Sequence, residues 1–335
     1  MERMTWPWKF ILLATACSGF VLVLEGVERD SNNSDDRDDC PYVHVGDQCL
    51  LFVNFQLDTY DVAQALCQGF GGNLVVIKTA TQMKAIMDYL YTDGDISNSY
   101  WMDGMLDNNT GRFTYASGEL VPMGTPFWGA TYTLHQPSGD GPCIELYSND
   151  HHYMNDLACD HIHFALCEFP FSSAGEEPKE ELQEVACEAP FTAVGDMCLA
   201  FLTQEHMSWE DAVLTCRLLG ENLAMFDDIE MLRSIYLHIH DQAMESKSFW
   251  LAGSDMITEG TWLWTSGSPV PMGSPFWGSS YPVPPFVEPN WNTSLNCLGL
   301  QAAGKHYFRA VDCQTLQYPL CMATLSQGSA TGNAK

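Results

Sequence analysis

Apolar residues recur at helical spacing in four segments of the chain, two in each half. The four predicted helical faces are Ala63/Leu66/Cys67/Phe70, Met83/Ile86/Met87/Leu90, Ala212/Cys216/Leu219 and Leu232/Ile235/Tyr236/Ile239. Such spacing places one side of a helix against a core. Glycines at Gly71-Gly72 and at Gly220 predict where the first helix of each half ends. Trp101 and Trp250 then fall in predicted strands, and strand-like segments separate the last three cysteines of each half.

Twelve of the thirteen cysteines form two series with nearly the same spacing. The series are Cys40, Cys49, Cys67, Cys143, Cys159, Cys167 and Cys187, Cys198, Cys216, Cys297, Cys313, Cys321. Successive separations are 9, 18, 76, 16 and 8 in the first series and 11, 18, 81, 16 and 8 in the second. The segment 121–129, VPMGTPFWG, also recurs as VPMGSPFWG at 270–278. The chain is therefore a tandem repeat, with five extra residues in one long loop of the second copy.

Composition narrows the class of protein. The chain has 335 residues, 46% of them hydrophobic, which is enough for two domains with cores of their own. Its formal charge of −29 comes from 43 acidic and 14 basic residues. Nucleic acid and anionic membrane surfaces both require a basic face, so neither is expected as a partner. So many cysteines are typical of an oxidising, extracellular compartment.

The segments outside the two copies have simple compositions. Residues 1–26 carry Arg3 and Lys9 before an apolar run that is short for a membrane span, and they predict a secretory signal. Its cleavage point stays open between 14–16, 17–19 and 24–26, and a type II membrane anchor is the weaker alternative. We expect an acidic spacer at 27–39, a first domain at 40–169, an acidic linker at 170–186, a second domain at 187–323 and a polar tail at 324–335. The protein is predicted to be secreted, without membrane insertion.

The order of these features resembles the C-type lectin-like domain. Two helices are followed by a W-x-x-G motif at Trp101–Gly104 and Trp250–Gly253, a long loop, two cysteines 16 apart and a third 8 further on. The tandem arrangement is similar to that of secreted two-domain lectins of arthropods, particularly crustaceans. The resemblance implies an α+β fold of two domains, each with two helices, antiparallel sheets, a long loop and three disulfides. The implied pairs are Cys40–Cys49, Cys67–Cys167, Cys143–Cys159, Cys187–Cys198, Cys216–Cys321 and Cys297–Cys313.

The resemblance also implies a sugar site in the long loop. Family members hold Ca²⁺ with side-chain oxygens that also hydrogen-bond the sugar hydroxyls. Exchanging the acid and the amide of the triplet therefore reverses the pattern of donors and acceptors that the protein presents to those hydroxyls. Glu288-Pro289-Asn290 matches the mannose-type triplet of the family, and Gln136-Pro137-Ser138 is similar to its galactose-type triplet. Family ligands near the next cysteines correspond to Asp140, beside the family's glutamate position, and to the Asn155-Asp156 pair. In the second copy the pair is replaced by Arg309-Ala310, so we expect the first copy to bind Ca²⁺ more tightly.

These features together predict a non-enzymatic glycan-binding protein. No nucleophile–base motif is present. Calcium is the expected cofactor, although both sets of ligands are incomplete, and the expected partners are glycans of microbial surfaces, in an innate immune role. The alternative is a calcium-independent module of the same fold that binds protein or lipid.

Two surface features complete the expectations. Asn32, Asn108 and Asn292 begin N-x-S/T sequons and are candidates for N-glycosylation in a secreted chain. The extra residues of the second loop lie within 281–287, where Pro284-Pro285 favours an extended, exposed arm. We expect no regular strand or helix in that arm.

Overall fold

The computed structural model describes residues 40–131, 134–170, 186–280, 286–287, 289 and 292–323. The predicted signal peptide, spacer and tail, almost all of the linker, and the residues Asn32, Glu288 and Asn290 lie outside the described residues. The described parts of both copies belong to one compact unit.

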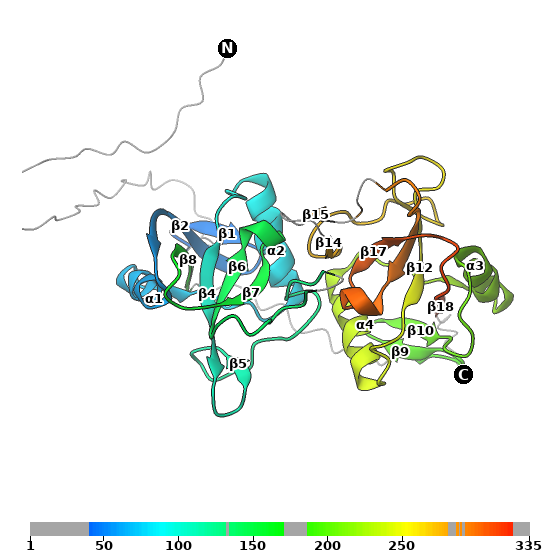
Figure 1. The fold of residues 1–335 in the computed structure, drawn as a ribbon, viewed down its shortest axis with the longest axis horizontal. Coiled ribbons are helices and arrows are strands. Elements are labelled where there is room, and N and C mark those ends of the chain that lie inside the picture. The colour runs from blue at the N-terminus through cyan, green and yellow to red at the C-terminus, as the bar shows by residue number, and fades with distance from the viewer. Residues whose placement is uncertain are drawn as a thin grey trace, which may run out of the picture. The chain divides into compact units, whose positions relative to one another are not determined.

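Each copy builds one large sheet and two α-helices in the same order, and the second copy adds a short two-stranded sheet. The first copy contains β1 (Val43–Val45), β2 (Gln48–Asp58), α1 (Tyr60–Gly69), β3 (Asn73–Leu74), α2 (Ala80–Thr92), β4 (Tyr100–Asp107), β5 (Arg112–Thr114), β6 (Cys143–Tyr147), the 3₁₀ helix η1 (Ser148–Asp150), β7 (Tyr153–Leu157) and β8 (His163–Phe169). The sheet order is β1-β2-β8-β4-β6-β7, with β3 paired to β8 and β5 to β4 (Figure 1).

The second copy repeats this arrangement. It contains β9 (Thr192–Val194), β10 (Met197–Phe201), α3 (Trp209–Leu218), β11 (Asn222–Leu223), α4 (Ile229–Asp241), β12 (Phe249–Ser254), β13 (Leu263–Trp264), β14 (Ser279–Ser280), β15 (Phe286–Val287), β16 (Cys297–Leu300), η2 (Ala302–Gly304), β17 (Phe308–Val311) and β18 (Tyr318–Ala323). Its sheet runs β9-β10-β18-β12-β16-β17. One neighbouring pair in each sheet is parallel, β4 with β8 and β12 with β18. The sheets are therefore mixed, whereas the family resemblance implied antiparallel sheets.

Three disulfides connect the elements of each domain. They join Cys40–Cys49, Cys67–Cys167, Cys143–Cys159, Cys187–Cys198, Cys216–Cys321 and Cys297–Cys313. These are the pairs that the family resemblance implies. The longest link α1 to β8 and α3 to β18, and the 16-residue pairs join the first residues of β6 and β16 to the segments that follow β7 and β17.

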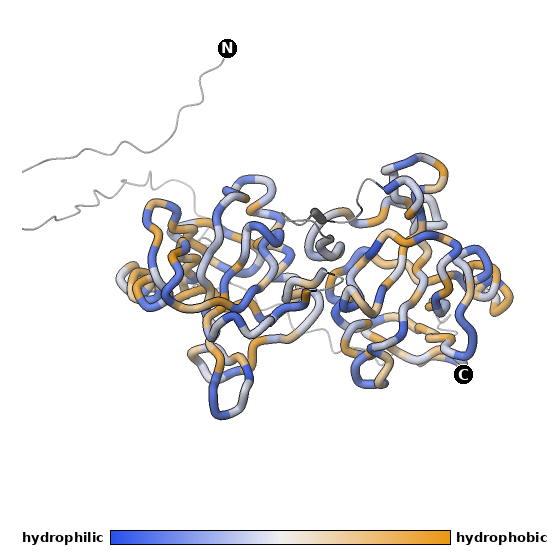
Figure 2. The backbone as a smooth tube through the Cα atoms, in the orientation of Figure 1, coloured by the Kyte–Doolittle hydropathy of each residue, from blue (hydrophilic) through white to orange (hydrophobic). Residues whose placement is uncertain are grey.

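The predicted helical faces are mostly buried. All four residues of the α2 face are at most 1% exposed, and Ala63 and Cys67 of α1 are fully buried. Phe70 and Leu219 were expected on the same faces, but they are 39% and 43% exposed. Each stands at the C-cap, one residue past its helix, where the last turn no longer directs the side chain into the core. Figure 2 shows hydrophobic and hydrophilic residues alternating along the tube of both domains.

The extra loop of the second copy corrects one expectation. Phe286–Val287 pairs with Ser279–Ser280 as a short antiparallel ladder, with Ser279 opposite Val287. We expected no strand within 281–287. The prolines at 282, 284 and 285 precede β15, so its two residues keep the backbone N–H groups that a ladder needs. Residues 281–285 lie outside the described part of the chain.

The two domains contact each other through equivalent residues. The Tyr153 hydroxyl donates to the Trp277 carbonyl, and the Tyr307 hydroxyl donates to the Trp128 carbonyl, both at 2.7 Å. Tyr153 and Tyr307 occupy the same repeat position, as do Trp128 and Trp277, and the two tyrosine rings pack edge-on at 5.2 Å. The interface is therefore approximately two-fold, with the same surface used by both copies.

A second set of bonds strengthens this interface next to the long loops. Arg233 of α4 donates to the carbonyls of Met123 and Thr125 at 2.7 and 2.8 Å. The Thr125 hydroxyl in turn donates to the Lys305 carbonyl at 2.5 Å. Because Met123 and Thr125 belong to the segment that leads into the long loop of the first domain, these bonds help to fix where that loop starts.

Candidate functional site

In the first domain, the candidate loop is ordered by a single buried carboxylate. Asp156, on β7, is 1% exposed and accepts the backbone amides of Ser138 at 2.6 Å and Gly139 at 2.8 Å. The Gly141 amide donates to the same carboxylate at a longer 3.4 Å. The Ser138 hydroxyl donates to exposed Asp140 at 2.7 Å. Asp156 thus does for this loop what a helix cap does for a helix end, by accepting otherwise unpaired amides.

Gln136 begins this loop and leaves one acceptor unused. The peptide bond between Gln136 and Pro137 is cis. The side-chain oxygen of Gln136 is buried and has no hydrogen-bond partner among the described residues. This acceptor lies beside exposed Ser138 and Asp140, where a small rotation of the Gln136 side chain would present it to a hydroxyl group from a ligand.

Asn155 lies on the opposite face of the sheet from Asp156. Successive residues of a strand point to opposite faces, and β7 follows that rule. The Asn155 amide donates to Glu145 on β6 at 2.9 Å. Burial raises the pKa of Glu145 to about 7 and lowers that of neighbouring His163 to about 4. Glu145 and His163, 3.4 Å apart, are therefore both mainly neutral between these values. The structure brings Gln136, Ser138, Asp140 and Asp156 together but separates Asn155 from them.

The folded loop does not fit a Ca²⁺ ion at the family position. The oxygens of Asp156 already face backbone N–H donors, and Asn155 faces Glu145. Gly141 stands where the family has a glutamate, and a Cβ atom there would collide with the backbone of Leu157 and Ala158. Calcium prefers six to eight oxygen ligands around one point. Within the described ranges, no group of three or more acidic, histidine or cysteine side chains is placed to hold a metal ion.

The second domain places a cation where the family has a calcium ligand. Arg309, on β17, is fully buried and donates to the Ser279 carbonyl and, at 2.6 Å, to the Ala130 carbonyl of the first domain. Leu295, at the family's glutamate position, packs against the core. A buried guanidinium repels a second cation, so this position does not fit Ca²⁺ either.

Arg309 also has a structural role that the sequence did not indicate. The Ser279 hydroxyl donates to Asp150 of the first domain. Burial raises the pKa of Asp150, and the Ser279 hydrogen bond, His151 and Arg309 oppose that rise only in part. From the sequence we expected Arg309 only to weaken calcium binding. Its position between apolar residues of a strand, in Phe308-Arg309-Ala310, is the signal that could have indicated a buried arginine.

The sequons have different positions in the structure. Asn108 lies in the exposed turn between β4 and β5, where Asp107 accepts the Asn109 amide and the Thr110 hydroxyl, both at 2.9 Å. Asn292 is exposed, and its side-chain oxygen accepts the Ser294 hydroxyl at 2.8 Å.

A family profile described as the Lectin C-type domain matches residues 56–169 and 205–323. The chain belongs to the C-type lectin family. Its members are non-enzymatic binding proteins, which confirms that expectation. The chain is 28% identical over 123 residues to C-type lectin domain family 4 member M of Hylobates lar, covering 36% of this chain and 27% of that protein.

Other relatives match parts of the chain. Galactose-specific lectin nattectin of Thalassophryne nattereri is 31% identical over 83 residues, which is 25% of this chain and 52% of nattectin. Lymphocyte antigen 75 of Mus musculus is 20% identical over 253 residues, 75% of this chain and 14% of that protein. The match to C-type lectin domain family 4 member M spans about a quarter of the length of that relative.

Solved structures of single domains align with parts of the chain. The mouse scavenger receptor C-type lectin carbohydrate-recognition domain has 23% identity and a TM-score of 0.33, over 41% of this chain and 95% of that domain. A calcium-independent type II antifreeze protein has 24% identity and a TM-score of 0.34, over 42% and 95%. Within the described residues, every helix is too short or too polar to cross a membrane.

Proposed function

We propose that the protein binds glycans through its two long loops and that the first domain does so without calcium. The observation that carries the proposal is the loop 136–141, which Asp156 orders through backbone amides while the Gln136 oxygen stays unpaired. A ligand hydroxyl can donate to Gln136, to Asp140 or to the Ser138 oxygen, since the Ser138 hydroxyl proton is already donated to Asp140. Such a ligand is a sugar with neighbouring hydroxyl groups.

The two loops are proposed to select different sugars. In the first domain, Gln136 and Ser138 correspond to a galactose-type triplet. In the second, Glu288 and Asn290 correspond to a mannose-type triplet. Single-site sugar binding is weak, and joining two sites in one chain raises avidity wherever one surface offers both sugars. The polypeptide is proposed to be a secreted two-domain lectin of the arthropod, particularly crustacean, type. Its proposed targets are glycans of microbial surfaces in innate defence.

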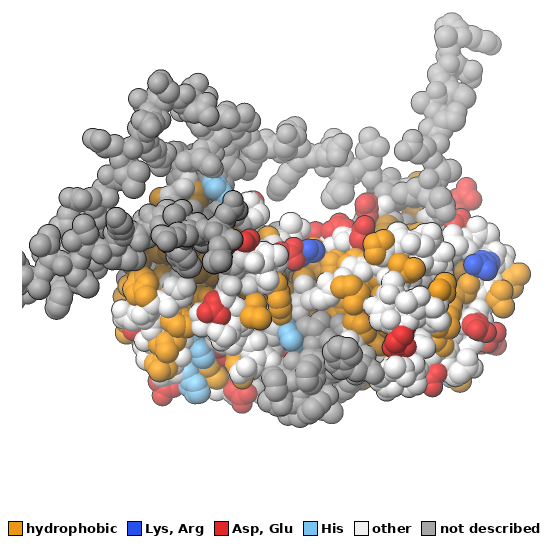
Figure 3. Space-filling view, turned by 90° about the horizontal axis from the view of Figure 1, so that it is seen from above, with side chains coloured by type: hydrophobic (Ala, Val, Ile, Leu, Met, Phe, Trp, Pro, Cys, Tyr) orange, Lys and Arg blue, Asp and Glu red, His pale blue; other side chains and the backbone are white. Residues whose placement is uncertain are grey.

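The charge of the molecule is in line with this proposal. On the face shown in Figure 3, acidic side chains outnumber basic ones, and the whole chain has a net charge of −29. A neutral sugar binds through directed hydrogen bonds and needs no basic surface, whereas an anionic polymer would need one. Nucleic acid therefore remains outside the proposed partners.

The experiment is a glycan array probed with the purified protein in the presence of EDTA, together with three variants. Gln136→Met should remove galactose-type binding and keep mannose-type binding. Asn290→Asp should do the reverse. Gln56→Met, an exposed glutamine on β2, is the matched control and should change neither. Array binding that is unaffected by Gln136→Met and Asn290→Asp would contradict the assignment of both loops.

A second candidate function is a module that binds protein or lipid without calcium. It is favoured by the same pair of observations that disfavours calcium, the engaged Asp156 carboxylate and the buried Arg309 guanidinium. An array with no bound sugar in either EDTA or Ca²⁺ would favour this candidate over glycan recognition.

A further inference from the structure

A cavity of about 360 Å³ lies beside the candidate sugar loop of the first domain. Its walls come from the β5 hairpin, the segment after it and the loop proline, and include Arg112, Phe113, Leu120, Val121, Met123 and Pro137. The volume falls within the range of small-molecule sites, which are mostly apolar with few polar groups. Pro137 directly follows Gln136, so this cavity and the candidate sugar loop share a wall.

The apolar lining is partly open to solvent. Phe113 and Val121 form a buried part at 5% and 2% exposure. Leu120 and Met123 are 55% and 42% exposed. Large apolar side chains grouped around a cavity leave water in contact with apolar surface, and an apolar ligand group would displace that water.

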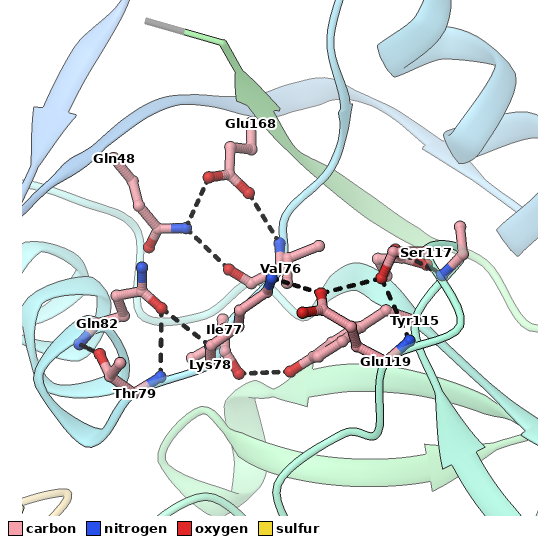
Figure 4. A network of polar contacts seen from close by, with 12 residues as sticks. Gln48, Val76, Ile77, Lys78, Thr79, Gln82, Tyr115, Ser117, Glu119 and Glu168 are labelled. Atoms are coloured by element: carbon pink, nitrogen blue, oxygen red, sulfur yellow. Dashed lines mark hydrogen bonds and ion pairs between the residues drawn. The ribbon is translucent and has the colours of Figure 1, made fainter. Parts of the chain in front are cut away.

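The cavity walls are held in place by polar contacts, so the site is preformed. The Tyr115 hydroxyl donates to the Ile77 carbonyl, and Lys78 pairs with Glu119, both at 2.5 Å (Figure 4). These two contacts anchor the turn that precedes Leu120. On the far wall, Arg233 holds the backbone of Met123. A preformed pocket costs less ordering entropy on binding.

Arg112 supplies one positive charge at this cavity. Within the described part of the chain, Arg112 forms no ion pair with a carboxylate. Asp107 lies opposite it on β4, but the Asp107 carboxylate accepts the Asn109 amide and the Thr110 hydroxyl. A guanidinium beside an apolar cavity is complementary to an anionic group attached to an apolar chain.

The second domain carries different residues at the same repeat positions. Thr261, Trp262 and Pro269 replace Arg112, Phe113 and Leu120. Trp262 is 4% exposed and packs on Trp277 at 5.1 Å between ring centres. The second copy therefore has no cation at this position and has a larger ring at the wall. The residues of the second copy also show that the fold accepts threonine in place of Arg112 and tryptophan in place of Phe113.

We propose that this cavity binds the acyl chain of an anionic, acylated glycan, with Arg112 contacting the anionic group. The sugar part of that ligand rests on the proposed function of the Gln136 loop. The acyl subsite itself rests only on the cavity, its exposed apolar rim and Arg112. This would give the first domain a preference for acylated over plain sugars.

The test uses the intact protein and two simple probes, octanoate and octyl β-glucoside, both below their micelle concentrations. Calorimetry should show octanoate binding at one site. Phe113→Trp should weaken octanoate binding at least roughly tenfold, because the larger ring fills the cavity. Arg112→Thr should weaken octanoate by about threefold, the scale of an exposed ion pair, and leave octyl glucoside unchanged. Leu120→Lys, at an exposed position, tests the rim without touching the core. Because the added lysine can attract octanoate, this variant is read with neutral octyl glucoside, whose binding it should weaken.

Each result bears on the proposal. The absence of octanoate binding, or full binding of octyl glucoside by both Phe113→Trp and Leu120→Lys, would overturn the acyl subsite. Equal effects of Arg112→Thr on both probes would overturn the anionic part. If the Phe113→Trp variant is unstable to heating, the binding measured for Leu120→Lys decides whether the acyl subsite exists. Octanoate binding by a protein that binds no glycan would leave the subsite standing and reject the proposed function, and the two are thus separated.

Discussion

The carboxylate of Asp156 accepts the backbone amide of Ser138 at 2.6 Å, across the gap between β7 and the long loop of the first domain. Together with the hydrogen bond from the Gly139 amide, this contact holds the loop through protein groups rather than through a bound ion. In the second domain, Arg309 donates hydrogen bonds to the Ser279 carbonyl and to the Ala130 carbonyl of the first domain. Both domains thus order their long loops with a side-chain charge at the place where the family resemblance implied a metal ligand.

The first prediction concerns this carboxylate. Asp156→Asn places an amide group against N–H donors, so at least one bond to a charged acceptor is lost. Such bonds contribute roughly 1.5–3 kcal/mol, and we expect a loss of about 2 kcal/mol in the free energy of unfolding. Asp140→Asn, at an exposed position two residues past Ser138, should stay within about 0.5 kcal/mol of the parent. Urea denaturation with and without Ca²⁺ measures both. Stabilisation by Ca²⁺ that disappears in Asp156→Asn would show that Asp156 is a metal ligand instead.

The reciprocal tyrosines predict how strongly the domains are coupled. Tyr153→Phe and Tyr307→Phe each leave one buried carbonyl, of Trp277 or of Trp128, without its donor. Each should cost about 1–3 kcal/mol, and the two costs should be similar because the positions are equivalent. Tyr42→Phe, at a 37% exposed position, is the control and should have little effect.

Calorimetry gives the readout for this pair. The parent protein should unfold in one transition, and the double variant should separate it into two. Independent melting of the domains already in the parent protein would contradict the interface.

Acid stability is predicted from a repeated pair of histidines. His152 and His306 are 1% and 2% exposed, and each contacts a backbone carbonyl, of Asn98 or of Lys247. Burial lowers the pKa of both to about 4. The neutral forms are favoured by folding, so their stability contribution is complete above pH 6.5 and is lost as the pH falls toward 4. Each accounts for about 2–3 kcal/mol over that interval.

The double variant His152→Asn/His306→Asn tests this. Both positions have left-handed backbone angles, which asparagine accepts. The unfolding free energy of the variant should depend less on pH between 6.5 and 4 than that of the parent. Exposed His161→Asn is the control and should keep the parent's slope, and an equal reduction by it would contradict the role of the buried pair.

The repeat, the helices and the family were predictable because they rest on local signals. The spacing of Met83, Ile86, Met87 and Leu90 marks a buried face whatever the rest of the chain does, and the cysteine series fixes the tandem order. The α2 capping box of Thr79 and Gln82 is equally local. The exposure of Phe70 was missed because it depends on which residue ends α1.

The contents of the site were not predictable because they depend on contacts between distant segments. The Asn155-Asp156 pair indicated two ligands for one ion, but strand alternation sends one residue to Glu145 and the other to the loop amides. The burial of Arg309 depends on the first domain, which supplies the Ala130 carbonyl 179 positions away. The apolar neighbours of Arg309 indicate that it is buried, but local sequence does not indicate which carbonyls it contacts or that loop amides occupy the Asp156 carboxylate.

The most direct test of the account is retention of the purified protein on galactose and mannan resins, measured in Ca²⁺ and then in EDTA. Because Asp156 and Arg309 hold the loops in place of a metal, the protein should stay bound to the galactose resin when Ca²⁺ is replaced by EDTA. Elution from that resin by EDTA would contradict the central claim that the first-domain loop is ordered without calcium.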